Sequence, residues 1–379
     1  MKIVIDARWI FEELTGIGTY TQELIRHLAL ADRENSYMLL FDRPDALEHM
    51  RQWADLEKAP NFDARLVPYG PFALRGQWEM AGRLKKLGAD VYHSTNYMIP
   101  LAAFPKHLRH KTRCVITIHD LIPLLFPEYT PRAKKTRMFP IYRRLMMQVG
   151  ARADVIICPS ASTRADVLEA LQMPGSRRDR VVVIPEGVSP AFRRDPEARK
   201  DGKTILYVGR QDPYKNVPRL IEAFAAVRAQ HLPDAHLKIV GPHDERYPEA
   251  DHRAKELGLA DAITWCGYLE EEDLVEAYQR ADVFVLPSDY EGFGLPVLEA
   301  MACGTPVVCS NVTSLPEVAG DAALMIDPDD TRALAEAIAR VLTDAALAEE
   351  LGRKGPEQAA KFQWARSARE TIEAYGLAM

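Results

Sequence analysis

Apolar residues recur along this chain in short continuous runs that alternate with stretches of helical periodicity. Such runs are typical of strands that are buried on both faces of a parallel sheet. In the first half of the chain they predict strands at residues 2–8, 37–42, 64–69, 90–94, 114–120, 154–160 and 180–185. In the second half they predict strands at residues 204–209, 236–241, 263–267, 283–288, 306–310 and 323–326. Helical patterns fill most of the gaps, which predicts parallel sheets covered by helices.

The alternation occurs twice, so we expect an α/β protein with two Rossmann-like domains facing a cleft. The stretch 189–202 separates the two series, because it carries many charges and two prolines without sustained periodicity. The predicted organisation is a first, acceptor-binding domain at 1–188, that linker, and a second, nucleotide-sugar-binding domain at 203–361. A C-terminal helix at 362–379 is expected to cross back and pack on the first domain.

The composition is that of an ordinary globular protein, with 47% apolar and 27% charged residues in a chain of 379. The N-terminus runs directly into a strand pattern, and no apolar run has the length needed to span a bilayer. The five cysteines form no C-x-x-C motif and fit small core positions. We therefore expect a cytoplasmic protein without disulfides.

The net charge of −6 is unevenly divided, because residues 1–185 carry a net +7 and residues 186–379 a net −13. Residues 132–152 hold seven Lys and Arg, no Asp or Glu, and many apolar side chains. This helical segment suits an anionic membrane surface or a lipid-diphosphate acceptor, and a solvated basic face is the alternative. The candidate surface residues are Arg132, Lys134, Lys135, Arg137, Arg143 and Arg144. Nucleic acid is not an expected partner, because no known binding motif accompanies these cations.

The segment from Glu291 to Glu299 joins a predicted strand to a predicted helix through a turn with two glycines. Backbone N–H groups and the positive end of the helix dipole meet at such a turn and suit an anion. Carboxylates beside an anion site make sense when the ligand also carries hydroxyl groups, as a sugar and a ribose do. The alternative is that Glu299 only complements the helix dipole and Glu291 is an exposed loop acid.

Other candidate residues also follow predicted strands. Arg210 and Lys215 lie on the loop after strand 204–209, where both can reach a diphosphate. His119 ends strand 114–120 and is either a site residue or a packed histidine. Ligands of open α/β sheets bind at this end of the strands, so these side chains are candidates for one site.

Two shorter motifs are less specific. Gly16 and Gly18 open a helix after the first strand, but Thr21 stands where a dinucleotide-binding fingerprint has its third glycine. They form either a loop that approaches a ligand phosphate or a tight turn. The Asp-x-Asp of Asp327–Asp330 precedes a helix and fits a turn and cap, so we assign no metal to it.

Taken together, these motifs resemble those of the retaining nucleotide-sugar glycosyltransferases of family 4, which have the GT-B fold. The resemblance covers nearly the whole chain. It is carried by Gly16–Gly18, His119–Asp120, Pro159–Ser160, Val183–Val188, Gly209–Arg210, Lys215–Asn216, Gly267–Leu269, Ser288, Glu291–Pro306, Phe362 and Trp364. Ile5–Arg8, His93–Thr95 and Thr117–Pro123 look most like bacterial mannosyltransferases of polysaccharide and O-antigen assembly.

The resemblance implies a role for each candidate residue. Arg210 and Lys215 would bind the donor diphosphate and stabilise the charge on the leaving nucleotide. Glu291 would hold sugar hydroxyls, and His119 would lie near the transferred sugar and the acceptor. The implied donor-binding residues are Gly16, Gly18, Gly209, Gly241, Tyr268, Leu269, Gly292, Phe293, Gly294, Leu295 and Glu299, the last of them on the ribose hydroxyls.

The implied reaction moves a hexose, with retention at the anomeric carbon and without metal or cofactor, to a lipid-linked or saccharide acceptor. GDP-mannose is the favoured donor, with UDP- and ADP-sugars as alternatives, and polysaccharide biosynthesis at the inner face of the cell membrane is the expected setting. The alternatives are a nucleotide-sugar epimerase or a phosphorylase on the same fold, and a non-catalytic subunit that binds sugar nucleotides.

Overall fold

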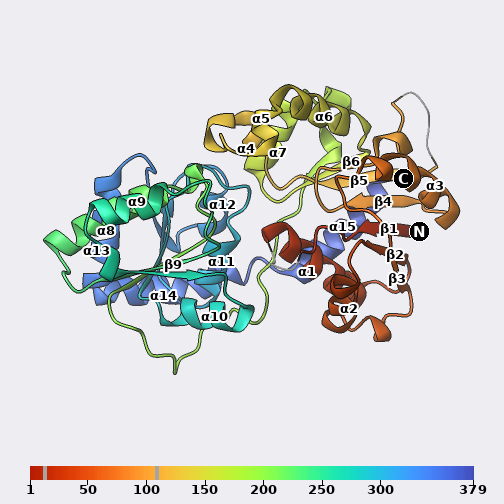
Figure 1. Cartoon of the computed structure of the whole chain (residues 1–379). Coiled ribbons are helices and arrows are strands. Elements are labelled where there is room, and N and C mark those ends of the chain that lie inside the picture. The colour runs from red at the N-terminus through yellow and green to blue at the C-terminus, as the bar shows by residue number, and fades with distance from the viewer. Residues whose placement is uncertain (12–14, 107–110) are drawn as a thin grey trace. The chain divides into compact units, whose positions relative to one another are not determined.

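The computed structural model describes residues 1–11, 15–106 and 111–379, which form two compact units (Figure 1). The first unit consists of Met1–Leu125, Met138–Gly187 and Gln363–Met379. The second unit consists of Phe126–Arg137 and Val188–Phe362. The chain therefore contributes a short early segment, Phe126–Arg137, to the unit that is otherwise built from its second half.

In the described residues of the first unit, seven parallel strands form a sheet in the order β3-β2-β1-β4-β5-β6-β7. The strands are β1 Lys2–Asp6, β2 Ser36–Phe41, β3 Phe62–Leu66, β4 Val91–Ser94, β5 Arg113–Thr117, β6 Val155–Cys158 and β7 Val181–Val183. The α-helices of this unit are α1 Gly16–Ala31, α2 Pro44–Trp53, α3 Leu74–Leu87, α4 Ile122–Leu125, α6 Phe139–Arg152, α7 Ala161–Ala170 and α15 Trp364–Ala378.

The second unit is built on a parallel sheet with strand order β10-β9-β8-β11-β12-β13. Its strands are β8 Thr204–Val208, β9 His236–Val240, β10 Ile263–Gly267, β11 Val283–Leu286, β12 Val307–Ser310 and β13 Ala323–Ile326. Its α-helices are α5 Lys134–Arg137, α8 Val217–Gln230, α9 Glu249–Glu256, α10 Glu271–Arg280, α11 Leu295–Ala302, α12 Leu315–Ala319, α13 Thr331–Thr343 and α14 Ala345–Ala359.

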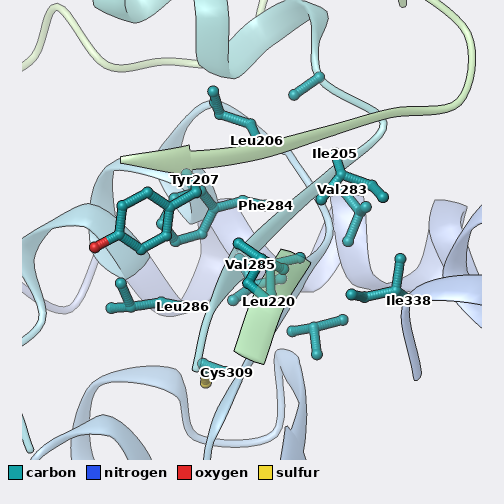
Figure 2. Close-up of a cluster of buried hydrophobic side chains, with 14 of the residues drawn as sticks. Ile205, Leu206, Tyr207, Leu220, Val283, Phe284, Val285, Leu286, Cys309 and Ile338 are labelled. Atoms are coloured by element: carbon teal, nitrogen blue, oxygen red, sulfur yellow. The ribbon is translucent and has the colours of Figure 1, made fainter. Parts of the chain in front are cut away.

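Side chains on both faces of the second sheet are buried, which explains the continuous apolar runs. All four residues of β11 have no exposed surface, and their side chains therefore enter the core from both faces of the sheet. Figure 2 shows this cluster, in which Leu220 of α8 and Ile338 of α13 accompany the strand side chains. The two α/β sheets predicted from the hydrophobic pattern are thus confirmed.

Each predicted strand is present, although several end earlier than expected. β5 stops at Thr117 and β11 at Leu286, because their apolar runs continue into the loops that follow. His119 and Ser288 therefore lie on loops beyond the strand ends. The helix predicted after Glu291 is α11, which begins at Leu295 and has Pro296 as its second residue.

The C-terminal helix α15 packs in the first unit, as expected, against α1, β5 and β6. The ring of Trp364 lies 5.8 Å from that of Tyr20, and a Cβ at Gly187 would come within 2.1 Å of the Trp364 backbone N. The charged stretch 188–202 belongs to the second unit, where the Phe192 side chain is buried.

The basic segment 132–152 is not one helix. It breaks at Met138 into α5, which belongs to the second unit, and α6, which belongs to the first. The expectation of one basic amphipathic segment is therefore wrong, because charge and apolar content alone do not reveal where a helix ends. Arg143 and Arg144 remain exposed on α6. Among the described residues, no helix has both the length and the apolar character needed to span a bilayer.

Candidate functional site

Three loops of the second unit carry most of the candidate residues. They follow β9, β8 and β11, which are neighbours in the sheet and run parallel. The carboxyl ends of parallel neighbours lie at one edge of a sheet, where ligands of open α/β sheets bind. The loops after β8, β9 and β11 therefore form one candidate site.

Glu291 and Lys215 form a nearly buried ion pair at this edge. The Lys215 Nζ lies 2.6 Å from Oε1 and 2.8 Å from Oε2 of Glu291, and the two side chains are only 13% and 10% exposed. Ser288 Oγ donates to Glu291 Oε1 at 2.7 Å, and the Glu291 backbone N donates to Thr313 Oγ1 at 3.0 Å. Glu291 is therefore held in place on all sides, and its interpretation as an exposed loop acid is wrong.

The glycine turn after Glu291 shapes the N-terminus of α11. Gly294 caps the helix with a φ of 102°, and a Cβ there would lie 2.7 Å from Leu315 Cδ2. Ser314 Oγ lies 2.8 Å from the carbonyl oxygens of both Glu291 and Phe293. Because the turn is held from outside and requires glycine, the backbone from Gly292 to Leu295 is preorganised beside the ion pair.

Glu299 lies in the second turn of α11 and is 8% exposed. Tyr278 donates its hydroxyl to Glu299 Oε2 at 2.9 Å. Burial, and then the Glu299 carboxylate, raise the pKa of Tyr278 well above its usual value, so this hydroxyl keeps its proton. Glu299 stands beyond the first helical turn, where the dipole has little effect, so a role limited to the dipole fits poorly.

Arg210 lies on the loop after β8 with its side chain half exposed. Its Nε donates to Asp212 Oδ2 at 2.9 Å, and its Nη2 lies 3.4 Å from Asp244 Oδ2. Tyr207 donates its hydroxyl to the Arg210 carbonyl oxygen at 2.6 Å. Burial, followed by the charges of Glu291 and Asp212, raises the pKa of Tyr207. The buried tyrosine therefore lies close to both ion pairs, and Arg210, Lys215 and Glu291 surround one strand end.

The remaining donor-site candidates lie on the same edge. Gly209 and Gly241 have φ values of 154° and 143°, and a Cβ on Gly241 would lie 2.1 Å from the Gly209 carbonyl oxygen. Gly241 N donates to the Gly267 carbonyl oxygen at 2.7 Å, which holds the ends of β9 and β10 together. Tyr268 and Leu269, both partly buried, follow directly after β10.

In the first unit, His119 is held by two strand-end loops. Its Nδ1 lies 3.2 Å from Glu186 Oε1 and its Nε2 lies 3.0 Å from the Thr95 carbonyl oxygen. The Tyr20 ring stands edge-on at 4.7 Å. The imidazole is thus hydrogen-bonded to backbone, as a packed histidine would be, and also oriented by a carboxylate. Glu186 belongs to the motif Val183–Val188, but its contact with His119, 67 residues away in sequence, was not predicted.

Gly16 and Gly18 lie in the first turn of α1, which Thr15 caps. Neither has a positive φ, and a Cβ on Gly16 would meet nothing within 4 Å. The two glycines therefore lie in a helix and not in a tight turn, and the backbone at residue 16 does not require glycine.

The Asp-x-Asp motif forms a turn and a cap, as predicted. Asp330 accepts from the Ala333 backbone N at 2.8 Å and caps α13, and Asp327 accepts from the Asp329 backbone N at 2.9 Å. Across the described residues, no three His, Cys, Asp or Glu side chains come together as a metal site would require. A reaction without metal stays a prediction.

Several residues that complete the site were not predicted. Sequence reasoning missed Asp212, Asp244, Tyr278, Thr313 and Ser314. Asp212 and Asp244 lie on loops without periodicity, and Tyr278 belongs to the apolar face of α10, where it has the appearance of a core residue. Only the folded loops show which polar atoms they face.

Solved structures that resemble this chain, each over nearly its whole length, include glycosyltransferases of the GT-B fold. Sucrose-phosphate synthase from Thermosynechococcus elongatus matches with a TM-score of 0.79 and 25% identity, over 99% of this chain and 98% of that one. Anabaena Alr3699/HepE, solved in complex with UDP-glucose, matches with a TM-score of 0.75 and 17% identity, over 98% of both chains. WaaG, a glycosyltransferase involved in lipopolysaccharide biosynthesis, matches with a TM-score of 0.71 and 18% identity over 98% of both chains.

Sequence relatives identify the family. The family described as Glycosyltransferase Family 4 matches residues 14–192, and the one described as Glycosyl transferases group 1 matches residues 188–358. O-antigen chain mannosyltransferase B of Escherichia coli is 31% identical over the whole of both chains. Serotype-specific mannosyltransferase WbdA of E. coli is 33% identical over 75% of this chain and 35% of its own. The chain belongs to family 4 of the glycosyltransferases.

Proposed function

We propose that this glycosyltransferase moves mannose from GDP-mannose to a lipid-linked or saccharide acceptor during assembly of a cell-surface polysaccharide. The observation that carries the proposal is the cluster of Arg210, Lys215 and Glu291 beside the N-terminus of α11. Two cations and the backbone N–H groups of a helix N-terminus suit a diphosphate, and a fixed carboxylate suits sugar hydroxyls. Mannose is favoured because the relatives described above, which match most of this chain, carry mannosyltransferase names.

In the proposed reaction, Arg210 and Lys215 stabilise the negative charge that develops on the diphosphate as the bond from the anomeric carbon to phosphate oxygen breaks. The acceptor oxygen forms its bond to the same carbon from the same face, so the configuration is retained. The acceptor proton passes to the departing phosphate oxygen. Both carboxylate oxygens of Glu291 already accept hydrogen bonds, which favours its holding the sugar over its attacking the anomeric carbon.

The other roles follow from position. Glu299 accepts from the ribose hydroxyls, and the loops that carry Gly241 and Tyr268 border the base. His119 lies near the transferred sugar and the acceptor, and Gly16 and Gly18 bind the donor. The exposed Arg143 and Arg144 of α6 contact anionic lipid, and the enzyme works at the cytoplasmic face of the membrane.

A thermal-shift screen with GDP, UDP, ADP and their sugars identifies the donor, because a cognate ligand stabilises the folded protein. We expect the largest shift with GDP-mannose. Labelled GDP-mannose is then incubated with lipid-linked and free saccharide acceptors, and NMR of the product reports the anomeric configuration. If no pair of donor and acceptor leads to release of nucleotide, although the protein binds nucleotide tightly, the result would favour a non-catalytic subunit. Conversion of the donor sugar to an epimer in the absence of acceptor would favour an epimerase. Cleavage of a saccharide that depends on inorganic phosphate would favour a phosphorylase.

A further inference from the structure

Residues Phe126–Arg137, named here the aromatic strap, belong to the second unit although the chain on both sides of them belongs to the first. The strap contains a 3-10 helix at Pro127–Tyr129 and the short helix α5. Its contacts are with the loops that carry the candidate site.

Two rings of the strap pack on two tyrosines of the donor-site loops. Phe126 and Tyr129 stack on each other, with ring centres 5.0 Å apart and an interplanar angle of 20°. Phe126 lies 5.7 Å from Tyr290, and Tyr129 stacks on Tyr214 at 6.4 Å with an angle of 28°. The four rings form a continuous cluster, and offset stacking of this kind is favourable and directional.

The two tyrosines are the chain neighbours of the residues assigned to the donor. Tyr214 directly precedes Lys215, whose Nζ lies 5.2 Å from the centre of the Tyr214 ring. Tyr290 directly precedes Glu291. The Asp289 backbone N also donates to the Tyr214 carbonyl oxygen at 2.8 Å, which ties the two loops to each other. A shift of the tyrosine rings therefore moves both members of the ion pair.

The strap also reaches the third loop of the site. Arg132 donates to the carbonyl oxygen of Arg246, and its guanidinium lies 5.5 Å from the ring centre of Tyr247. Arg246 pairs at 2.6 Å with Asp244, the carboxylate that lies 3.4 Å from Arg210. The strap thus contacts the loop that carries Arg210 and Lys215, the loop that carries Glu291, and the loop after β9 that carries Asp244.

We propose that Phe126 and Tyr129 are positioning residues, which hold Lys215 and Glu291 in the geometry that binds the nucleotide sugar. The inference rests on the proposed function of that ion pair. The two rings touch the loops and not the reacting atoms, so they act through the ion pair. Charge-assisted hydrogen bonds to a diphosphate depend on the placement of the charged groups, so displacement of the ion pair should weaken binding of the donor.

The test compares Tyr129→Ala, Tyr129→Phe and Phe126→Leu with the wild-type enzyme. Tyr129→Ala and Phe126→Leu are expected to raise KM for the nucleotide sugar at least 10-fold, with a smaller change in kcat. Tyr129→Phe is expected to have a KM within twofold of the wild-type value, because the ring and not the hydroxyl makes the contact. Phe72→Ala, which removes a 59% exposed ring from the first unit, is the control and should leave KM unchanged.

A double-variant comparison separates positioning from a general loss of stability. Tyr129→Ala should have no further effect on binding of the nucleoside diphosphate when Lys215 is already alanine, because it acts through that side chain. Equal effects in both backgrounds would overturn the inference, and so would unchanged KM in folded Tyr129→Ala and Phe126→Leu. If Tyr129→Ala does not fold, Phe126→Leu and Tyr129→Leu decide. Failure of the wild-type enzyme to bind any nucleotide sugar would instead overturn the proposed function.

Discussion

Lys215 and Glu291, 76 residues apart in the chain, face each other with the ammonium nitrogen 2.6 and 2.8 Å from the two carboxylate oxygens. The pair compensates two charges that are almost removed from water, so each stabilises the other before any ligand is bound. A diphosphate and a sugar hydroxyl offer the two groups new partners of matching polarity. The ion pair is therefore both a structural element and the centre of the proposed donor site.

Removal of either charge of the Lys215–Glu291 pair should destabilise the fold. Lys215→Ala and Glu291→Ala are each expected to lower the free energy of unfolding by about 2 kcal/mol, because each leaves one nearly buried charge unpaired. The double variant should lose less than the sum, and urea denaturation of the three variants measures the difference. Lys203→Ala is the control: its pair with Asp234 is 42% and 66% exposed, so the change should stay within about 0.5 kcal/mol. Strictly additive losses would contradict the coupling.

Arg210 should matter for catalysis and little for stability. Its side chain is 50% exposed, so Arg210→Ala is expected to change the unfolding free energy by no more than about 0.5 kcal/mol. Loss of one preorganised cation at the leaving diphosphate should lower kcat about 100-fold or more. Arg280→Ala, at 47% exposure and paired with Asp201, is the matched control and should keep full activity. Equal activity of the two variants would rule out the proposed role of Arg210.

The ribose role of Glu299 can be tested with altered nucleotides. Glu299→Gln keeps the shape but removes the charge that strengthens hydrogen bonds from ribose hydroxyls, so binding of the nucleoside diphosphate should weaken about 10-fold. The 2′,3′-dideoxy analogue lacks those hydroxyls and should bind the variant and the wild-type enzyme equally well. Calorimetric titration measures both affinities. A loss of the same size for the dideoxy analogue would show that Glu299 acts elsewhere.

Stability should fall in mild acid because of His93. Its ring is fully buried between the Tyr375 hydroxyl at 2.8 Å and Thr117 Oγ1 at 2.9 Å. Burial first, and then the charge of His119, lowers the pKa of His93 to about 3. In the unfolded chain a histidine titrates near pH 6.5. Below that pH the unfolded state binds a proton at His93 and the folded state does not, which lowers the free energy of unfolding. The stabilisation is complete above pH 6.5 and is lost progressively between pH 6.5 and 3.

By pH 5 this residue should have cost about 2 kcal/mol of the unfolding free energy. Urea denaturation of the wild-type protein and of His93→Gln at pH 7 and pH 5 measures the effect. The variant is expected to be less stable at pH 7 but to lose less between the two pH values. If the wild-type protein and the variant lose the same unfolding free energy between pH 7 and pH 5, groups other than His93 cause the pH dependence.

The strands were the most predictable part of the fold. A parallel strand covered on both faces must be apolar along its whole length, so runs such as 283–288 and 236–241 are visible without any partner. Their ends were less visible, because the apolar run after β5 or β11 continues into the loop. The helix break at Met138 and the assignment of the aromatic strap to the second unit could not be predicted from the sequence, because they depend on which surface each segment packs against.

The loops of the candidate site could be placed because parallel strands have their carboxyl ends at one edge, which brings the loop of Arg210 and Lys215 together with the distant loop of Glu291. Their partners could not be placed. Whether Arg210 faces Asp244, or Glu299 faces Tyr278, depends on loop paths and side-chain directions that no spacing in the chain records.

The amino-acid sequence by itself determined the two parallel sheets and the edge at which the candidate site lies, because these follow from periodicity and strand direction, and its motifs carried the resemblance to family 4 glycosyltransferases. Only the tertiary structure decided that Glu291 is paired rather than exposed, that the α1 turn does not require a glycine at residue 16, and that the basic segment is divided between the units. Those features arise from contacts between residues far apart in the chain, whose energies depend on distances that exist only after folding.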